Sequence, residues 1–262
     1  AENGNVALTG EIDLQASDGA FVLALGFDSH ALSAGHHVRA SLLDGFDVAL
    51  AQYIEDWQQW QSTLLSLEGG DKDQGSLYRI STAVLHTHEA KQFPGGLIAS
   101  LSIPWGFAKG DDDLGGYHLV WTRDLVETVG GLVAAGAQAA ARRGLRYLQV
   151  TQEADGHWPQ NMWLDGTPYW GGVQLDEASF PILLAAQAWR EGTLETNELS
   201  QLWPMVRQAA GYIVRNGPVT QQDRWEEDAG YSPFTLAVEI SALLAAAELA
   251  ELADESEVAT YL

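Results

Sequence analysis

The sequence contains no cysteine among its 262 residues. This absence excludes a disulfide framework and thiol chemistry, but it does not decide the compartment, because many exported bacterial proteins also lack cysteine. No apolar run approaches the roughly 18 residues that span a bilayer, and the start of the chain lacks the basic and apolar regions of a signal peptide. We therefore expect a soluble globular chain, with any signal peptide removed or lying outside this sequence.

Basic residues are also scarce, since 13 Lys and Arg stand against 36 Asp and Glu, for a formal net charge of -23. A field of that sign repels a phosphate backbone and an anionic lipid surface, so neither nucleic acid nor a membrane is an expected partner. A neutral ligand fits this charge. The ten Trp suit a sugar, because pyranose C–H faces stack on indole rings, although most of them are expected to lie in the core.

The first 44 residues have the pattern of β structure. Two runs within residues 6–27 tend to alternate apolar and polar side chains, and they are split by the turn signal Ser17, Asp18, Gly19. This pattern predicts a β-hairpin. Because a two-stranded hairpin is barely stable alone, we expect it to complete a larger sheet, so that residues 1–44 are the end of a β domain.

From residue 45 onward the pattern becomes helical. Apolar residues recur at spacings of three and four from Phe46 to Leu65, which predicts an amphipathic linker helix within residues 45–73. Further helices are predicted over 74–90, 124–138, 139–153, 175–191, 197–216 and 233–253.

These later helices alternate in kind. The segment 234–252 is apolar nearly all round, as an inner helix would be, whereas 197–216 mixes charged and apolar residues like an outer one. Ser232 and Pro233 form an N-cap and first-turn pair. Residues 74–262 are therefore expected to form about half of an α/α barrel, with loops at one end building a pocket.

The strongest chemical signal is the run Trp225, Glu226, Glu227, just before the predicted inner helix. Adjacent carboxylates beside an indole could place one acid on a glycosidic oxygen and hold a sugar hydroxyl with the other. From spacing alone, an acidic flank that complements the helix dipole is a slightly better interpretation.

Two further segments carry weaker signals. Arg123 and Asp124 are adjacent at the start of a predicted helix, where they could clamp vicinal hydroxyls or simply form a cap and ion pair. The long loop 155–177 carries Trp170, which could be a stacking platform, and ends with Gln174 and Asp176 at the mouth of the next helix.

Metal binding is not indicated. The run Asp111, Asp112, Asp113 could suggest the magnesium-binding acids of a terpene cyclase, but it lies in a Gly-rich loop and is more typical of a solvated turn. His86 and His88 are two residues apart and match no metal-binding spacing. We expect no metal and no organic cofactor; a structural calcium is not argued from any residue.

The three segments together resemble glycoside hydrolase family 15, the bacterial glucoamylases and glucodextranases. The resemblance implies a mainly α fold: the terminal strands of an antiparallel β-sandwich, a linker helix and part of an (α/α)6 barrel. It implies that Glu226 is the general acid, that Glu227 and Trp225 bind substrate beside it, and that Arg123 and Asp124, preceded by Trp121, hold the nonreducing-end glucose. Trp170 would stack on the sugar. Asp176 would support the pocket.

The resemblance also implies an inverting, exo-acting hydrolase that releases glucose from an α-glucan outside the cytoplasm, extracellularly or in the periplasm. The family's catalytic base lies in the second half of the barrel and matches no residue here, so the missing half would come from a further segment or a second chain. A noncatalytic carbohydrate-binding or regulatory fragment is the alternative. The linkage, whether 1,4, 1,6 or trehalose, and hydrolysis versus transglucosylation stay open.

Overall fold

The structure, a computed structural model, describes residues 9–16, 18–67, 75–101 and 116–262. The chain divides into two compact units, Ala1–Leu64 and Leu65–Leu262. The boundary after Leu64 falls inside the segment 45–73 that the sequence assigns to a linker, and the three-part division of the chain stays a prediction. Each unit is described separately.

The first unit contains two helices, α1 (Ala31–Asp44) and α2 (Phe46–Ser62). The structure confirms α2 as the helix predicted from Phe46. Helix α1 was not predicted; it buries no side chain, so its sequence carries little helical periodicity.

The prediction of a β-hairpin over residues 6–27 is wrong, because residues 9–16 and 18–27 form no strand. Only its turn is present: Asp18 and Gly19 have positive φ angles, and the Gly19 N–H donates to the Leu14 carbonyl at 2.7 Å. The flanking apolar side chains, such as Leu23 and Phe27, are exposed. Two strands with no further strand to pair with cannot bury enough apolar surface to hold a ladder together.

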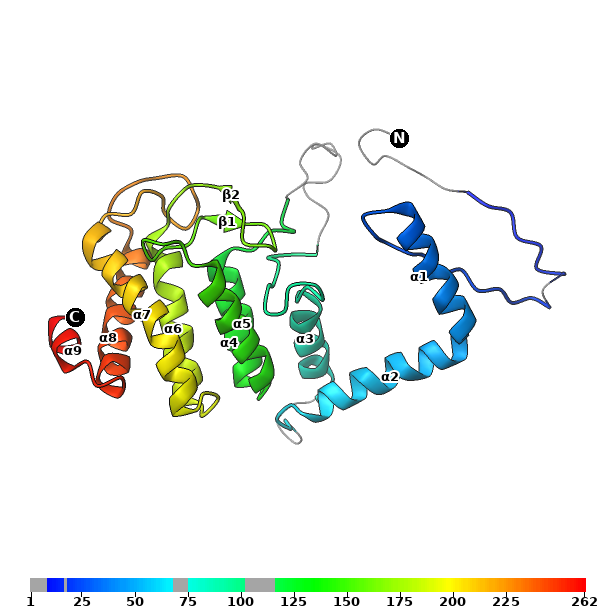
Figure 1. The fold of residues 1–262 in the computed structure, drawn as a ribbon, viewed down its shortest axis with the longest axis horizontal. Helices are drawn as coiled ribbons and strands as arrows, with labels where there is room; N and C mark the ends of the chain where they lie inside the picture. The colour runs from blue at the N-terminus through cyan, green and yellow to red at the C-terminus, as the bar shows by residue number, and fades with distance from the viewer. Residues whose placement is uncertain (1–8, 17, 68–74, 102–115) are drawn as a thin grey trace. The chain divides into compact units, whose positions relative to one another are not determined.

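The second unit is helical, and all but the last of its helices confirm the predicted series to within a few residues at each end (Figure 1). They are α3 (Ser76–Thr87), α4 (Thr122–Ala134), α5 (Gln138–Thr151), α6 (Leu175–Arg190), α7 (Thr196–Asn216), α8 (Pro233–Leu252) and α9 (Ser256–Tyr261). Helix α6 packs between α4 and α8, while α3, α5 and α7 each pack on a member of that row. This is the alternation of inner and outer helices in an α/α barrel.

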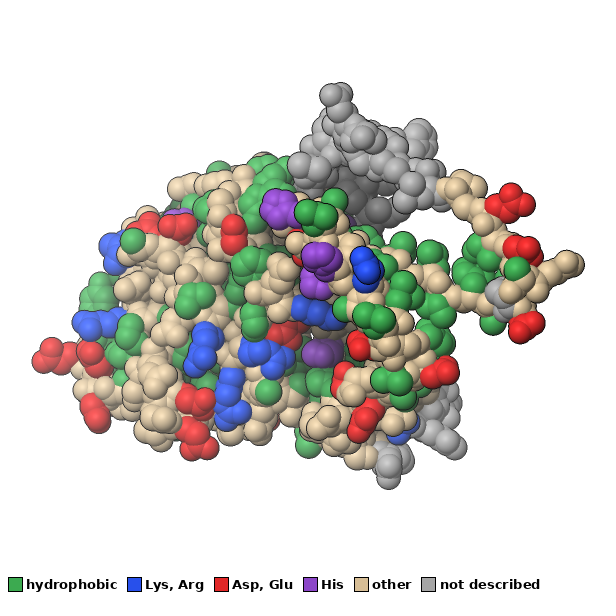
Figure 2. All heavy atoms as spheres, turned by 45° about the vertical axis from the view of Figure 1, so that its right-hand side comes forward, with side chains coloured by type: hydrophobic (Ala, Val, Ile, Leu, Met, Phe, Trp, Pro, Cys, Tyr) green, Lys and Arg blue, Asp and Glu red, His purple; other side chains and the backbone are tan. Residues whose placement is uncertain are grey.

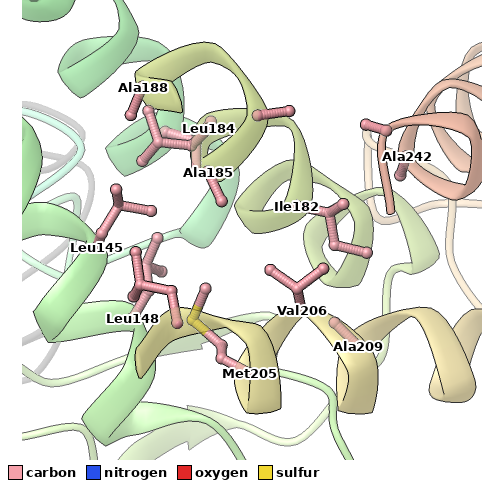
Figure 3. Packing of buried hydrophobic residues seen from close by; sticks show 14 of the residues in the cluster. Leu145, Leu148, Ile182, Leu184, Ala185, Ala188, Met205, Val206, Ala209 and Ala242 are labelled. Atoms are coloured by element: carbon pink, nitrogen blue, oxygen red, sulfur yellow. The ribbon is translucent and has the colours of Figure 1, made fainter. Parts of the chain in front are cut away.

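The core of this unit lies between the two rows of helices (Figure 3). Leu148 of α5, Ile182 of α6 and Val206 of α7 are fully buried there, each contributing roughly 1.5 to 3 kcal/mol by leaving water. Helix α8 adds small side chains, among them Ala242 and Ala246, which are also fully buried. Small residues on this face let α6 and α8 approach closely.

Helix α8 begins as predicted, with the Ser232 hydroxyl accepting from the Thr235 N–H at 3.4 Å and Pro233 in the first turn. It is also long and apolar enough to cross a membrane by length and composition, which corrects the expectation that no segment reaches that length. Packing against α6 and α7 buries 44% of its apolar stretch, and a helix in the core of a protein can have the same length and composition.

One end of the helices carries the loops. Strands β1 (Asn161–Met162) and β2 (Pro168–Trp170) form an antiparallel pair in which Asn161 lies opposite Trp170. Figure 1 shows this pair and the loop before α8 at the same end, where α4, α6 and α8 begin. Three connections that are distant in sequence are thereby brought together above the inner helices.

Candidate active site

A pocket of about 520 Å³ opens among these connections. Its walls come from the segment before α4, the first turns of α4, strand β2 and the loop before α8. The lining residues are Ala99, Gly116, Tyr117, Trp121, Arg123, Asp124, Glu127, Trp170, Arg224, Trp225 and Glu226. A pocket of this size, with two arginines, three carboxyls and several aromatic rings, suits a polar ligand of one or a few sugar rings.

Glu226 is held by both its backbone and its side chain. The indole Nε1–H of Trp121 donates to Glu226 Oε1 at 3.1 Å. The Glu226 N–H donates to the Asp223 carbonyl at 2.9 Å, and its φ angle of 68° places it in the left-handed region. A non-glycine residue in this region costs about 1 kcal/mol or more and persists where its surroundings fix it, as often happens at functional sites.

The loop around Glu226 is organised by Asp223. Asp223 Oδ1 accepts from the N–H groups of Trp225 at 3.0 Å and Glu227 at 3.2 Å. The Asp223 N–H in turn donates to the Asp228 carbonyl at 2.8 Å. These bonds close a tight loop around Glu226.

Arg123 is anchored by three side chains at the beginning of α6. Its Nη1 donates to Asp176 Oδ2 at 2.7 Å and to Gln174 Oε1 at 3.2 Å, and it lies 3.4 Å from Glu177 Oε1. Burial works against the charged guanidinium, but Glu177 and Asp176 outweigh it and raise the pKa of Arg123. The guanidinium is therefore a fixed positive group at the pocket wall.

Asp124, the next residue, is a partly buried carboxyl in the pocket. Burial raises its pKa, and the nearby carboxylates Glu127 and Glu226 add to that rise against the opposing effect of Arg123. The Asp124 carboxyl accepts hydrogen bonds and the Arg123 guanidinium donates them, so the pair can hold adjacent hydroxyls of one sugar.

Glu177 lies behind this pair and is fully buried. Its Oε2 accepts from the Thr122 N–H at 3.0 Å, which ties the first turn of α6 to the first turn of α4. Burial raises the pKa of Glu177 well above its ordinary value, although Arg123 opposes the shift.

Aromatic rings form the rest of the pocket. Trp121 lies edge-on to Trp170 with ring centroids 6.4 Å apart, and Tyr117 lies 5.9 Å from Trp121. The Trp170 N–H donates to Asn161 Oδ1 at 3.1 Å, which fixes the strand that carries this indole. Trp170 is 46% exposed, so its ring is free to contact a ligand.

The structure brings most of the predicted residues together. Trp121, Arg123, Asp124, Trp170, Trp225 and Glu226 all line the pocket, although they span about a hundred positions. Glu227 is exposed and does not line it. Asp176 is fully buried behind the wall, where it holds Arg123.

Several residues of the pocket were missed by sequence reasoning. Glu127 follows Asp124 by three positions and so shares its helix face, which was a usable signal. Arg224 lies over the Trp225 ring at 4.6 Å and over Phe234 at 4.7 Å, a placement that no local pattern indicated. The Asp111–Asp113 run lies outside the described residues, and within the described ranges no group of three His, Cys, Asp or Glu is placed to hold a metal ion.

The whole chain is similar to known proteins. The sequence profile of "Glycosyl hydrolases family 15" matches residues 72–158 and 153–262, and that of "Glucodextranase, domain N" matches residues 1–62. A glucoamylase from Clostridium sp. (strain G0005) is 39% identical over 248 residues, which are 95% of this chain and 34% of that protein.

The fold of this chain is also similar to the solved structures of two glucoamylases. The crystal structure of a bacterial glucoamylase complexed with acarbose has a TM-score of 0.79 and 38% identity, covering 88% of this chain and 33% of that one. The glucoamylase from Saccharomycopsis fibuligera, with a TM-score of 0.57, 19% identity and coverage of 70% and 44%, shares the fold. This chain spans about a third of the length of the two bacterial relatives. On its profile match and its similarity to the Clostridium protein, the chain belongs to glycosyl hydrolases family 15.

Proposed function

We propose that this chain forms the general-acid side of the active site of an inverting, exo-acting α-glucan hydrolase that releases glucose from nonreducing ends. The observation that carries the proposal is the placement of Glu226, which faces one pocket with Arg123 and Asp124 and is oriented by the Trp121 indole at 3.1 Å. Family membership supports the reaction class.

In this proposal the carboxyl of Glu226 protonates the glycosidic oxygen as the bond to the anomeric carbon breaks. Arg123 and Asp124 bind adjacent hydroxyls of the terminal glucose, and the Trp170 face covers the ring. Inversion needs a second carboxylate roughly 6.5 to 9.5 Å from the acid, to activate a water on the opposite side of the sugar.

We propose that this base comes from a further part of the barrel, either a following segment or a second chain. Support comes from α8, whose side chains Ile240 and Leu244 are 59% and 67% exposed although the helix is an inner one. Apolar side chains of an inner helix are covered when the ring of helices is complete.

The test replaces Glu226 with Gln in the complete enzyme. The variant keeps the shape of the site but cannot donate the proton, so hydrolysis of maltose should fall by about 10² to 10⁴-fold. Hydrolysis of α-glucosyl fluoride should fall much less, because fluoride leaves with little protonation. Affinity for acarbose, the ligand bound in the similar bacterial glucoamylase, should be retained.

The 262-residue chain by itself provides the complementary measurement. It should bind acarbose but turn over neither maltose nor the fluoride, and adding the rest of the barrel should restore turnover. Substantial glucose release by the purified chain without any partner would contradict the proposal, because a base would then lie within this sequence. Binding without turnover even after completion of the barrel would favour a noncatalytic carbohydrate-binding role.

The proposed substrate is an α-glucan or α-glucoside, and the proposed location is extracellular or periplasmic, where polymeric glucans are accessible. Activity measured separately in culture fluid, periplasmic extract and cytoplasm of the producing cells tests this location. Rates on maltose, isomaltose and trehalose test the linkage.

A further inference from the structure

Gln174 joins Arg123, at one wall of the pocket, to the loop that carries Glu226. It is the N-cap residue of α6 and is fully buried. Its Oε1 accepts from Arg123 Nη1 at 3.2 Å, and its Nε2 donates to the Asp223 carbonyl at 2.5 Å. A single amide therefore touches both the arginine at one wall of the pocket and the loop that carries Glu226.

The Asp223 carbonyl is the significant partner, because it also accepts the N–H of Glu226 at 2.9 Å. Gln174 therefore fixes the same oxygen that holds the backbone of Glu226 in its left-handed conformation. Only a side chain with both an acceptor and a donor can join a guanidinium to a carbonyl, and asparagine is one methylene shorter.

A separate bond anchors the loop as a whole. The Leu175 N–H donates to Thr220 Oγ1 at 3.2 Å, and that hydroxyl donates to the Gln222 carbonyl at 2.6 Å. Replacing Gln174 therefore leaves the loop attached to α6 and alters mainly the position of Asp223 and Glu226.

We propose that Gln174 is a positioning residue that sets the alignment of the Glu226 carboxyl relative to the Arg123 and Asp124 pair. The consequence for catalysis rests on the proposed function; the geometric coupling does not. Misplacement of a catalytic group by about 1 Å can cost roughly a hundredfold in rate, so a residue that joins acid and sugar clamp affects turnover without touching the substrate.

The first experiment reads the geometry in the 262-residue chain, without any reaction. The indole N–H of Trp121 donates to Glu226, so its ¹H–¹⁵N NMR signal, assigned by its loss in Trp121→Phe, reports the position of the acid. Gln174→Met removes both hydrogen bonds, and Gln174→Glu removes the donor while keeping an acceptor for Arg123. Both should shift the Trp121 signal and speed its exchange with water.

Gln152→Glu is the matched control. The Gln152 amide donates to the carbonyls of Gly156 and Met205, both at 3.0 Å, and it does not line the pocket. Its loss should leave the Trp121 signal in place. If Gln174→Met does not fold by circular dichroism, Gln174→Glu alone decides. An unchanged Trp121 signal in a folded Gln174 variant overturns the proposal.

The second experiment measures kinetics in the complete enzyme. Gln174→Glu should lower kcat on maltose by roughly tenfold to a hundredfold, with KM nearly unchanged and a smaller loss on α-glucosyl fluoride. Gln174→Met should also raise KM, because Arg123 loses a partner. Equal losses on both substrates would mean a merely structural role and would overturn the proposal. Absence of hydrolysis by the unsubstituted enzyme would count against the proposed function alone, since the NMR result still decides the coupling.

Discussion

At the scale of single residues, the Trp121 indole determines where the Glu226 carboxyl points. The 3.1 Å bond joins a residue at the N-cap of α4 to one in a loop 105 positions later. The indole N–H is a donor only, so it orients the carboxyl without competing for its proton.

Trp121→Phe should therefore reduce turnover while keeping most of the aromatic wall. Misplacement of a catalytic group by about 1 Å can cost roughly a hundredfold in rate, so in the proposed reaction we expect kcat on maltose to fall by about tenfold or more. Steady-state kinetics of the complete enzyme provides the measurement, with Trp163→Phe, outside the pocket lining, as the control. Equal kcat values for Trp121→Phe and the unsubstituted enzyme would show that the bond does not orient the acid.

Glu177 determines how stability depends on pH. Its folded-state pKa is raised well above its ordinary value of 4.5 by burial, so the folded chain holds its proton over a range where the unfolded chain has released it. This contribution to stability is fully present below pH 4.5 and is lost as pH rises through the folded-state pKa. Burial raises the pKa of Asp124 and Glu239 in the same direction.

The prediction is that the free energy of unfolding of this chain falls as pH rises above 4.5, by up to about 1.4 kcal/mol per pH unit for one proton. Glu177→Gln, which mimics the protonated carboxyl, should flatten this slope. Asp124 and Glu239 contribute to what remains in the same direction, and His86, whose pKa burial lowers, contributes in the opposite direction below its ordinary value of 6.5. Urea denaturation from pH 4.5 to 8 measures both slopes, and the exposed Glu191→Gln serves as control. A slope unaffected by the change at Glu177 would rule this carboxyl out as its source.

At the scale of elements, α4 and α5 pack closely because Gly144 faces Val129. A Cβ atom at position 144 would lie 2.8 Å from Val129 Cγ2, closer than real contacts allow. In α7, a Cβ at Gly211 would meet only the flexible end of Arg215 at 3.0 Å.

Gly144→Ala should therefore destabilise the chain, whereas Gly211→Ala should not. Alanine stabilises a helix interior by about 1 kcal/mol relative to glycine, but overpacking against a stiff β-branched side chain costs roughly 1 to 3 kcal/mol. Thermal unfolding of the chain should show a lower Tm for Gly144→Ala and an equal or higher Tm for Gly211→Ala. A raised Tm at position 144 would mean that the two helices separate without cost.

The elements differ in how far the sequence predicts them. Helix α8 has a strong local signal in Ser232, Pro233 and its apolar run, and its start is correct to the residue. Residues 6–27 carry an alternating pattern, but a strand is stable only beside its partners, which the pattern cannot supply.

The candidate site shows the same division. Arg123, Asp124 and Glu226 stand in local motifs, and the resemblance of those motifs to a known family predicted their place in the site. The contacts of Glu177 and Gln174 join residues 49 to 55 positions apart, and no local pattern encodes which side chain they meet. Burial in three dimensions, not spacing, makes Glu177 unusual.

At the scale of the whole molecule, acidic side chains outnumber basic ones, and several of the basic side chains form ion pairs with nearby carboxylates on the surface. On the helical unit, Lys and Arg side chains lie among Asp and Glu side chains (Figure 2). Arg207 lies 3.3 Å from Glu255, and Arg190 pairs with Glu248. Exposed pairs of this kind contribute little to stability, so the large net charge acts mainly through solubility and choice of ligand.

Helix α8 exposes two large apolar side chains, Ile240 and Leu244, through which we expect this chain to associate with a further part of the barrel. If Ile240 and Leu244 contact a further part of the barrel, the double change to Ser should weaken association of this chain with that part by at least tenfold. It should also reduce self-association of the isolated chain in sedimentation experiments. Val150→Ser is the control, because Val150 is 73% exposed on the outer helix α5. Unaltered association of the double variant would place the contact elsewhere.

The inner helices α4, α6 and α8 all begin at the pocket end, and this arrangement separates the parts of the chain that determine stability from those that determine selectivity. The side chains that hold the helices together lie along their lengths, whereas those that line the pocket lie in the first turns of α4 and in the connections that precede the inner helices. Exchanging the connection 152–174 or 217–232 between homologues should therefore redirect linkage preference with little repacking of the interior. Loops held on a rigid scaffold can change in sequence without disturbing the interior that supports them.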